Sequence, residues 1–126
     1  HHISFLQNLC PEAKFWGFVS EVQKFELLSR AHVLLFPSVH EGWGLVTVDA
    51  ASVGTPTVAY NVSGVRDSVI DGQTGILVKE GDIKKLADAI SMIKSGFIKS
   101  DECKKWASKF TWEKSTLNSL KFIENL

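Results

Sequence analysis

The feature that most constrains this chain is an alternation of short, continuously apolar runs with amphipathic segments of helical length. Runs rich in Val, Ile, Leu, Phe or Trp, each ended by a turn residue, predict four strands over 14–19, 33–36, 57–60 and 75–78. Continuously apolar strands are typical of parallel sheets, whose strands are joined by crossover helices. The pattern therefore predicts an α/β fold, with a Rossmann-like parallel sheet and flanking helices.

Helix signals lie on both sides of the second predicted strand. Ser20 and Gln23 form a capping-box pattern, and the apolar stripe after them, with Val22, Phe25 and Leu28, predicts a helix that runs to Arg30. A second helix is predicted from about 44 to 53, because Gly54 and then Pro56 stop it.

The C-terminal part of the chain is also predicted to be helical. Asp82 is the expected N-cap of a helix that ends at Gly96. Its apolar stripe is Leu86, Ala87, Ile90 and Ile93. Residues 101–126 carry large apolar side chains at helical spacing, which predicts two short helices with a break near Thr111.

Composition describes one ordinary globular domain. The chain has 126 residues, of which 44% are hydrophobic and 22% charged, so it does not resemble a disordered tail. Its 14 basic residues balance 14 acidic ones, and no run of Lys or Arg exceeds two. The basic footprint of a nucleic-acid-binding protein is therefore missing, and no nucleic-acid partner is expected.

Cysteines and apolar runs bear on the compartment. Cys10 and Cys103 form no CxxC pattern, which favours free thiols in a reducing cytosol. No apolar stretch approaches the roughly 20 residues that span a bilayer. We expect a soluble, cytoplasmic protein. No metal site is expected either, since His32, His40, Asp67 and Asp71 show no ligand spacing.

The segment HEGWGLVTVDAASVGT, from His40 to Thr55, carries the predicted site. Glu41 lies in a glycine-bounded turn, and Asp49 lies inside an otherwise uncharged helical run. A carboxylate among apolar residues is unfavourable unless it is hydrogen-bonded, so this pair predicts a clamp for a polyol ligand. Between the two carboxylates, the start of the helix near Gly44 offers free N–H groups that attract an anion.

The spacing of the two carboxylates indicates the kind of ligand. Glu41 and Asp49 are eight positions apart, which places their Cα atoms on the order of 10 Å apart if most of the segment is helical. The paired carboxylates of a retaining glycosidase stand only about 5 to 5.5 Å apart. The wider spacing fits an extended ligand laid out as ribose, diphosphate and sugar. Ordinary turn glycines, and a carboxylate that merely favours a helix start, remain alternatives.

Longer stretches resemble a known family. EGWGLVTVD followed by AASVGTPTVA, preceded by AHVLLFPS and followed by GVRDSVIDGQTGILV, is similar to the C-terminal half of family-four retaining glycosyltransferases of the GT-B fold. That half binds the nucleotide-sugar, and the resemblance runs from about 15 to 93. In the family, a Glu, seven residues and a second Glu form the signature. Glu41 matches the first, and Asp49, one methylene shorter, stands at the second.

The resemblance implies roles for particular residues. Glu41 would be the catalytic residue that meets the donor sugar, and Asp49 would meet the ribose, directly or through water. The residues whose backbone would face the sugar and diphosphate are Gly42, Trp43, Gly44 and Leu45, with Ser38 on the pocket floor. Val19 and Ser20 would face the base. Lys24 and Arg66 are interpreted as solvated surface charges in preference to phosphate ligands.

The resemblance also implies a larger enzyme. Residues 1–126 would form a partial C-terminal donor-binding domain, with 101–126 as its C-terminal helices and the N-terminal strands of the domain missing. An N-terminal domain would bind the acceptor glycan or lipid, and the fragment alone would be inactive. UDP- and GDP-linked sugars head the expected donors, with no cofactor. Peripheral contact of the parent enzyme with a membrane stays open.

Rival interpretations belong to other functional classes. The chain could be a noncatalytic module that binds a nucleotide or a glycan, or an interaction domain that uses Trp106 and Trp112. A related GT-B epimerase or phosphorylase would share the sheet, but it would not predict this carboxylate spacing.

Overall fold

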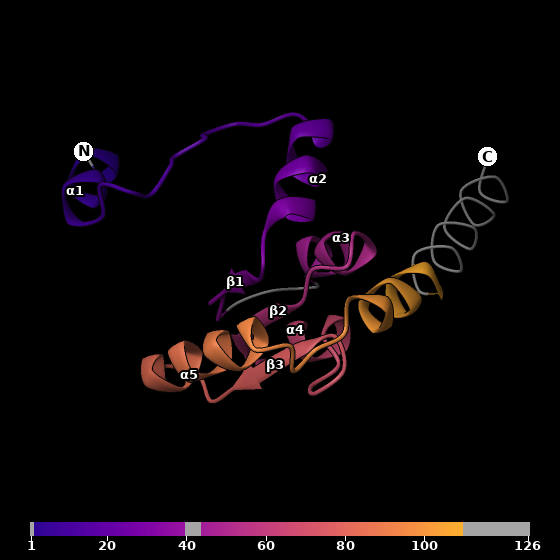
Figure 1. Ribbon diagram of the computed structural model, residues 1–126. Helices are drawn as coiled ribbons and strands as arrows, with labels where there is room; N and C mark the ends of the chain where they lie inside the picture. Colours follow the sequence, from indigo (N-terminus) through magenta and orange to yellow (C-terminus); the bar gives the residue numbers. More distant parts are fainter. Residues whose placement is uncertain (1, 40–43, 110–126) are drawn as a thin grey trace, which may run out of the picture.

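Three parallel strands form the centre of the computed structural model, which describes residues 2–39 and 44–109. The elements follow the order α1 (His2–Leu9), α2 (Glu21–Arg30), β1 (Leu34–Phe36), α3 (Leu45–Ser52), β2 (Thr57–Tyr60), α4 (Val65–Ser68), β3 (Gly75–Val78) and α5 (Ile83–Lys94). A further helical segment covers 100–109. Figure 1 shows helices flanking this small sheet, as the α/β prediction requires.

The sheet has the order β1-β2-β3, and both strand pairs are parallel. Leu34 pairs with Thr57, and Thr57 pairs with Gly75, so the three strands start at one edge and end at the other. All four residues of the central strand β2 are buried. The loops that follow the strands therefore gather at one edge, where open α/β sheets bind ligands.

Most predicted elements are confirmed. The strands 57–60 and 75–78 have the predicted bounds, and β1 begins one residue later than expected. The capping box at Ser20 and Gln23 is present, and α2 ends at Arg30 as predicted. Gly54 follows α3 with φ +85°, a conformation that suits glycine at a helix end.

The predicted strand over 14–19 is wrong. In Figure 1 this segment is an extended arm that joins the outlying helix α1 to α2. Phe15, Trp16 and Phe18 are 39%, 56% and 106% exposed, and the sheet of the described chain has three strands rather than four. An apolar run becomes a strand only where a neighbouring backbone accepts its hydrogen bonds, and β1 pairs only with β2 here.

Two predicted apolar stripes need correction. In α5, Ala87 is exposed and Ala89 is buried, because the buried face follows Leu86, Ala89 and Ile93. In α2, Val22 is 77% exposed, while Leu28 is buried. The correction in α5 follows from the helical period, which places positions three and four apart on one face.

The hydrophobic core lies around β2. Helix α3 contacts β1 and β2, α5 contacts β2 and β3, and α2 lies against α3. The core residues that are less than 1% exposed are Ala50, Val58, Ala59, Val65, Cys103 and Ala107. The last two come from 100–109, so the predicted C-terminal helical region is confirmed as far as the structure describes it. The break near Thr111 lies outside the described residues.

The helical segment 100–109 fastens the edge where the strands begin. Cys103 Sγ lies 3.8 Å from the Thr74 carbonyl oxygen, just before β3. A Cβ on Gly54, just before β2, would overlap Ser100 Oγ. Both contacts involve the loops that enter the sheet.

Candidate functional site

The predicted site lies at the edge where the strands end. Ser38 follows β1 and is half-buried, and Gly44 is the N-cap of α3. Glu41, Gly42 and Trp43 lie outside the described residues, so their predicted roles remain predictions. The structure describes the remaining predicted residues: Val19, Ser20, Ser38, Gly44, Leu45 and Asp49.

The start of α3 has no side-chain cap among the described residues. Gly44 supplies no side chain, and its carbonyl oxygen accepts from the Thr47 N–H at 3.0 Å. The Leu45 side chain is 68% exposed. First-turn N–H groups without a capping side chain carry partial positive charge, so this end of α3 can attract an anion.

A buried hydroxyl pair anchors this helix start. Thr47 Oγ1 lies 2.6 Å from the Gly44 carbonyl oxygen and 2.8 Å from Ser68 Oγ, and its single hydrogen is shared between them. Ser68 Oγ donates to the Val65 carbonyl oxygen at 3.1 Å. Trp106 Nε1 donates to the Ser68 carbonyl oxygen at 3.3 Å. Helix α4 and segment 100–109 therefore both hold the start of α3.

Packing alone accounts for the glycine at position 44. A Cβ there would lie 2.8 Å from Ser68 Oγ and 3.2 Å from Thr47 Oγ1. Gly44 is buried and has a negative φ of −83°, so close approach, rather than backbone conformation, excludes a side chain.

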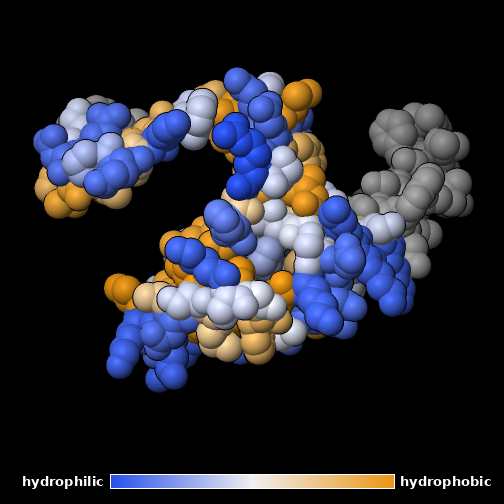
Figure 2. Space-filling model, viewed as in Figure 1, coloured by the Kyte–Doolittle hydropathy of each residue, from blue (hydrophilic) through white to orange (hydrophobic). Residues whose placement is uncertain are grey.

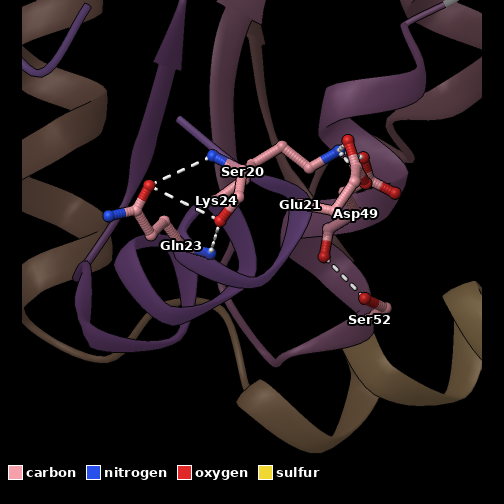
Figure 3. Close-up of polar contacts among 6 residues, drawn as sticks. All are labelled: Ser20, Glu21, Gln23, Lys24, Asp49 and Ser52. Carbon is pink, nitrogen blue, oxygen red and sulfur yellow. Dashed lines mark hydrogen bonds and ion pairs between the residues drawn. The ribbon is translucent and has the colours of Figure 1, made fainter. Parts of the chain in front are cut away.

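Asp49 is held by a cation from another helix. Its Oδ2 lies 2.8 Å from Lys24 Nζ, and the two side chains are 25% and 28% exposed. Lys24 Nζ also lies 2.9 Å and 3.1 Å from the two carboxylate oxygens of Glu21. Figure 3 shows the ammonium between the two carboxylates. Hydrogen bonds to Asp49 and then to Glu21 raise the pKa of Lys24 above its ordinary value.

This pairing corrects the interpretation of Lys24 as a solvated surface charge. The predicted need of Asp49 for a partner is met, but the sequence did not identify the partner, because 25 residues separate the two. Arg66 is exposed, as expected, and donates to the Asn61 carbonyl oxygen at 3.3 Å. The sequence also did not identify Thr47 and Ser68 as residues that hold the start of α3. The only sequence signal for them is that each carries a hydroxyl side chain next to an apolar residue.

The predicted base-binding and ribose-binding residues come together. Ser20 caps α2, and its Oγ accepts from the Gln23 N–H at 3.1 Å (Figure 3). Lys24, one turn further along α2, reaches Asp49 on α3. Val19 is half-buried beside this cap. The loop before α2 and the carboxylate on α3 therefore border one region.

Two surface hollows are lined by residues other than the predicted site residues. One hollow of about 140 Å³ lies between Trp16 and α2, and one of about 210 Å³ lies beside Trp106, Gln73 and Lys105. Within residues 2–39 and 44–109, no group of three or more His, Cys, Asp or Glu is arranged to hold a metal ion. In the same part of the chain, no helix has the length and apolarity to cross a membrane.

Comparison with known proteins identifies a family. The profile described as "Glycosyl transferases group 1" matches residues 7–110. A glycogen synthase of Mycobacterium tuberculosis (strain ATCC 25618 / H37Rv) is 38% identical over 80 residues, which cover 64% of this chain and 19% of the relative. A D-inositol 3-phosphate glycosyltransferase of Corynebacterium diphtheriae is 34% identical over 93 residues, which cover 74% of this chain and 19% of the relative.

A third relative is named for capsule synthesis. The capsular polysaccharide biosynthesis glycosyltransferase CapM of Staphylococcus aureus is 37% identical over 65 residues, which cover 52% of this chain and 17% of CapM. The chain thus spans about a fifth of the length of the curated relatives it matches.

Proposed function

Because this chain belongs to the glycosyl transferases group 1, we propose that it forms the nucleotide-sugar-binding part of a retaining glycosyltransferase. The observation that carries the proposal is the arrangement along α3. An uncapped helix start lies at one end, and a half-buried carboxylate beside the α2 cap lies further along. The family match supports glycosyl transfer, and this arrangement supports the donor as the ligand.

The nucleotide would occupy the side of α3 that faces α2. Asp49 follows Gly44 by five residues, which is about 7 Å along a helix. That distance matches the reach from a diphosphate to the ribose of the same nucleotide. The ribose hydroxyls would donate to Asp49, the base would lie against Val19 and Ser20, and UDP and GDP are the leading candidates.

The diphosphate would lie against the first turn of α3. The N–H groups of Leu45 and its neighbour would bind phosphate oxygens, with the backbone of Gly42 and Trp43 beside them and Ser38 on the floor. The helix dipole would stabilise the negative charge that develops as the diphosphate departs. We propose no metal or other cofactor for this step.

The sugar would extend toward Glu41, whose carboxylate would accept hydrogen bonds from its hydroxyls and orient the anomeric carbon. A hexosyl group would pass to an acceptor hydroxyl, such as that of a glycan or a lipid, with retention at the anomeric carbon. The acceptor would be bound by another part of a longer enzyme. The thiols Cys10 and Cys103 are free, in keeping with a reducing cytoplasm.

A ligand panel tests the donor site. The melting temperature of the purified chain is measured with UDP, GDP, ADP and their sugars. A ligand at ten times its Kd stabilises the folded state by about 1.4 kcal/mol, which raises the melting temperature of a domain this size by roughly 5 °C. A nucleoside alone, without phosphate, is the control and should give a smaller shift. No shift with any nucleotide would contradict the proposal.

Glu41→Gln separates the transferase from a noncatalytic binding module. In an active enzyme that contains this chain, the variant should lose turnover by at least tenfold while UDP or GDP binding changes little, because Glu41 is assigned to the sugar. If Glu41→Gln lowers turnover and nucleotide binding by the same small factor, the result would favour a binding module. The relatives bear names of transferases and a synthase, so the module is not favoured.

A further inference from the structure

We infer that Lys24 is a positioning residue for the nucleotide, which holds one oxygen of Asp49 and so presents the other to the ribose hydroxyls. The inference rests on the proposed function and adds a residue from a different helix to the site. It stands on the geometry of Lys24, Glu21 and Asp49 (Figure 3).

The ammonium of Lys24 is held on several sides. It lies 2.8 Å from Asp49 Oδ2, 2.9 Å and 3.1 Å from the two Glu21 oxygens, and 4.9 Å from the centroid of the Phe25 ring. The Lys24 N–H donates to the Ser20 carbonyl oxygen at 2.9 Å, which fixes the base of the side chain in the first turn of α2. A flexible four-carbon stem is thereby held in one place, facing α3.

Asp49 keeps an oxygen for a ligand. The bond from Lys24 reaches Oδ2 only, and an ionised carboxylate can accept at both oxygens. The Asp49 side chain is only a quarter exposed, and the Lys24 ammonium at 2.8 Å gives it a hydrogen-bonded cationic partner in this half-buried position. Among the residues that the structure describes, Oδ1 has no hydrogen-bond partner to compete with a ligand, so it suits the neighbouring hydroxyl donors of a ribose.

Lys24 also balances charge where a dianionic ligand would bind. Glu21, Lys24 and Asp49 together carry one net negative charge, and removal of the lysine charge would leave two. The two uncompensated carboxylates, Glu21 on α2 and Asp49 on α3, would repel a diphosphate held at the start of α3. The lysine therefore has an effect on the ribose contact and a separate effect on overall nucleotide affinity.

The test compares a nucleotide with its analogue that lacks the ribose hydroxyls. Dissociation constants are measured by calorimetry on the full chain, for whichever of UDP, GDP and ADP binds best and for its 2′,3′-dideoxy counterpart. The wild type should prefer the ribonucleotide on the order of tenfold or more, because charged hydrogen bonds to hydroxyls are lost in the analogue. In Lys24→Met, the dissociation constants of the ribonucleotide and of its dideoxy counterpart should differ by no more than about threefold.

Matched variants separate positioning from stability. Lys84→Met removes an exposed lysine on α5 and should keep the wild-type preference. Lys24→Arg keeps the charge and should retain most of the preference. Asp49→Asn should lose it, and the double variant Lys24→Met with Asp49→Asn should show the same ribonucleotide preference as Asp49→Asn, since both changes act on one ribose contact. If Lys24→Met does not fold, Lys24→Gln, which removes the charge but keeps a polar side chain, carries the test.

The outcomes are distinguishable. A wild type that binds none of the nucleotides overturns the proposed function, and with it this inference. A wild-type preference that survives in Lys24→Met, even if both ligands bind more weakly, overturns the role of Lys24 and leaves the donor site standing. Loss of the preference in Lys24→Met, with retention in Lys24→Arg and Lys84→Met, supports the inference.

Discussion

A buried thiol couples the stability of this domain to alkaline pH. Cys103 has no exposed surface, and burial raises the pKa of its thiol from an ordinary 9.0 to about 11. Between these values the unfolded thiol has lost its proton and the folded thiol has kept it. The native state then binds more protons, so the free energy of unfolding falls as pH rises from 9 to 11.

We predict a loss of about 2–3 kcal/mol over that range from Cys103 alone. Urea unfolding of wild type and Cys103→Ala should show a stability difference that is constant up to about pH 8.5 and shrinks toward pH 11. Cys10→Ala, which alters an exposed thiol, should follow the wild-type slope. A difference that does not change with pH would contradict the prediction.

At the residue scale, the sequence predicts what a side chain needs better than which residue supplies it. Asp49 lies among Val48, Ala50 and Ala51, so its need for a partner could be predicted. Lys24 could not be identified as that partner, because only the packing of α2 on α3 brings the two together. The roles of Glu41, Gly42 and Trp43 remain predictions of the resemblance.

At the scale of the secondary-structure elements, three helical segments meet at the start of α3: α3 itself, α4 and segment 100–109. A Cβ on Gly44 would meet Ser68 of α4, and the Ser68 carbonyl oxygen accepts from Trp106 of segment 100–109. We predict that Gly44→Ala lowers the free energy of unfolding by about 1–3 kcal/mol, because its Cβ would lie 2.8 Å from Ser68 Oγ. Urea unfolding measures the loss.

Ser68→Ala is the matched control for the predicted effect of Gly44→Ala. Removal of the Ser68 hydroxyl opens the space that the new methyl group needs, so the double variant should be more stable than the sum of the two single losses predicts. Strictly additive losses would show that the contact between these two positions is not what excludes a side chain at Gly44.

Helices and strands whose ends are marked by capping or turn residues could be predicted from the sequence. The α2 capping box and the turn residues around β2 and β3 determine their bounds within the chain itself. The run over 14–19 has strand-like composition, but its state depends on whether another backbone lies beside it, which composition does not encode. The short helix α4 was missed because four residues offer no period to detect.

On the scale of the whole molecule, the arm over 10–19 stands apart from the core. Figure 2 shows hydrophobic atoms on α1 and near the start of α2, and Phe18 is fully exposed. We predict that chymotrypsin cuts after Phe15, Trp16 or Phe18 before it cuts inside β2, β3 or α5, since exposed segments open at little free-energy cost. Mass spectrometry of early fragments measures the order.

Replacing Phe15, Trp16 and Phe18 together by Ala should remove these early fragments without changing the melting temperature by more than about 2 °C, because the arm adds little to the core. First cleavage inside the sheet, or a large fall in melting temperature, would show that the arm packs against the body in solution.

Segment 100–109 contacts the sheet at the edge where β2 and β3 begin, whereas the candidate ligand site lies at the edge where the strands end. This separation offers a practical route for protein engineering. Segment 100–109 clasps the loops before β2 and β3, at Gly54 and Thr74. The loops after β1 and β2 lie on the opposite rim, beside Ser38 and Asn61. A library that randomises 37–39, 61 and 63, and leaves the buried Val62 unchanged, would therefore vary ligand preference while segment 100–109 keeps its contacts with the scaffold.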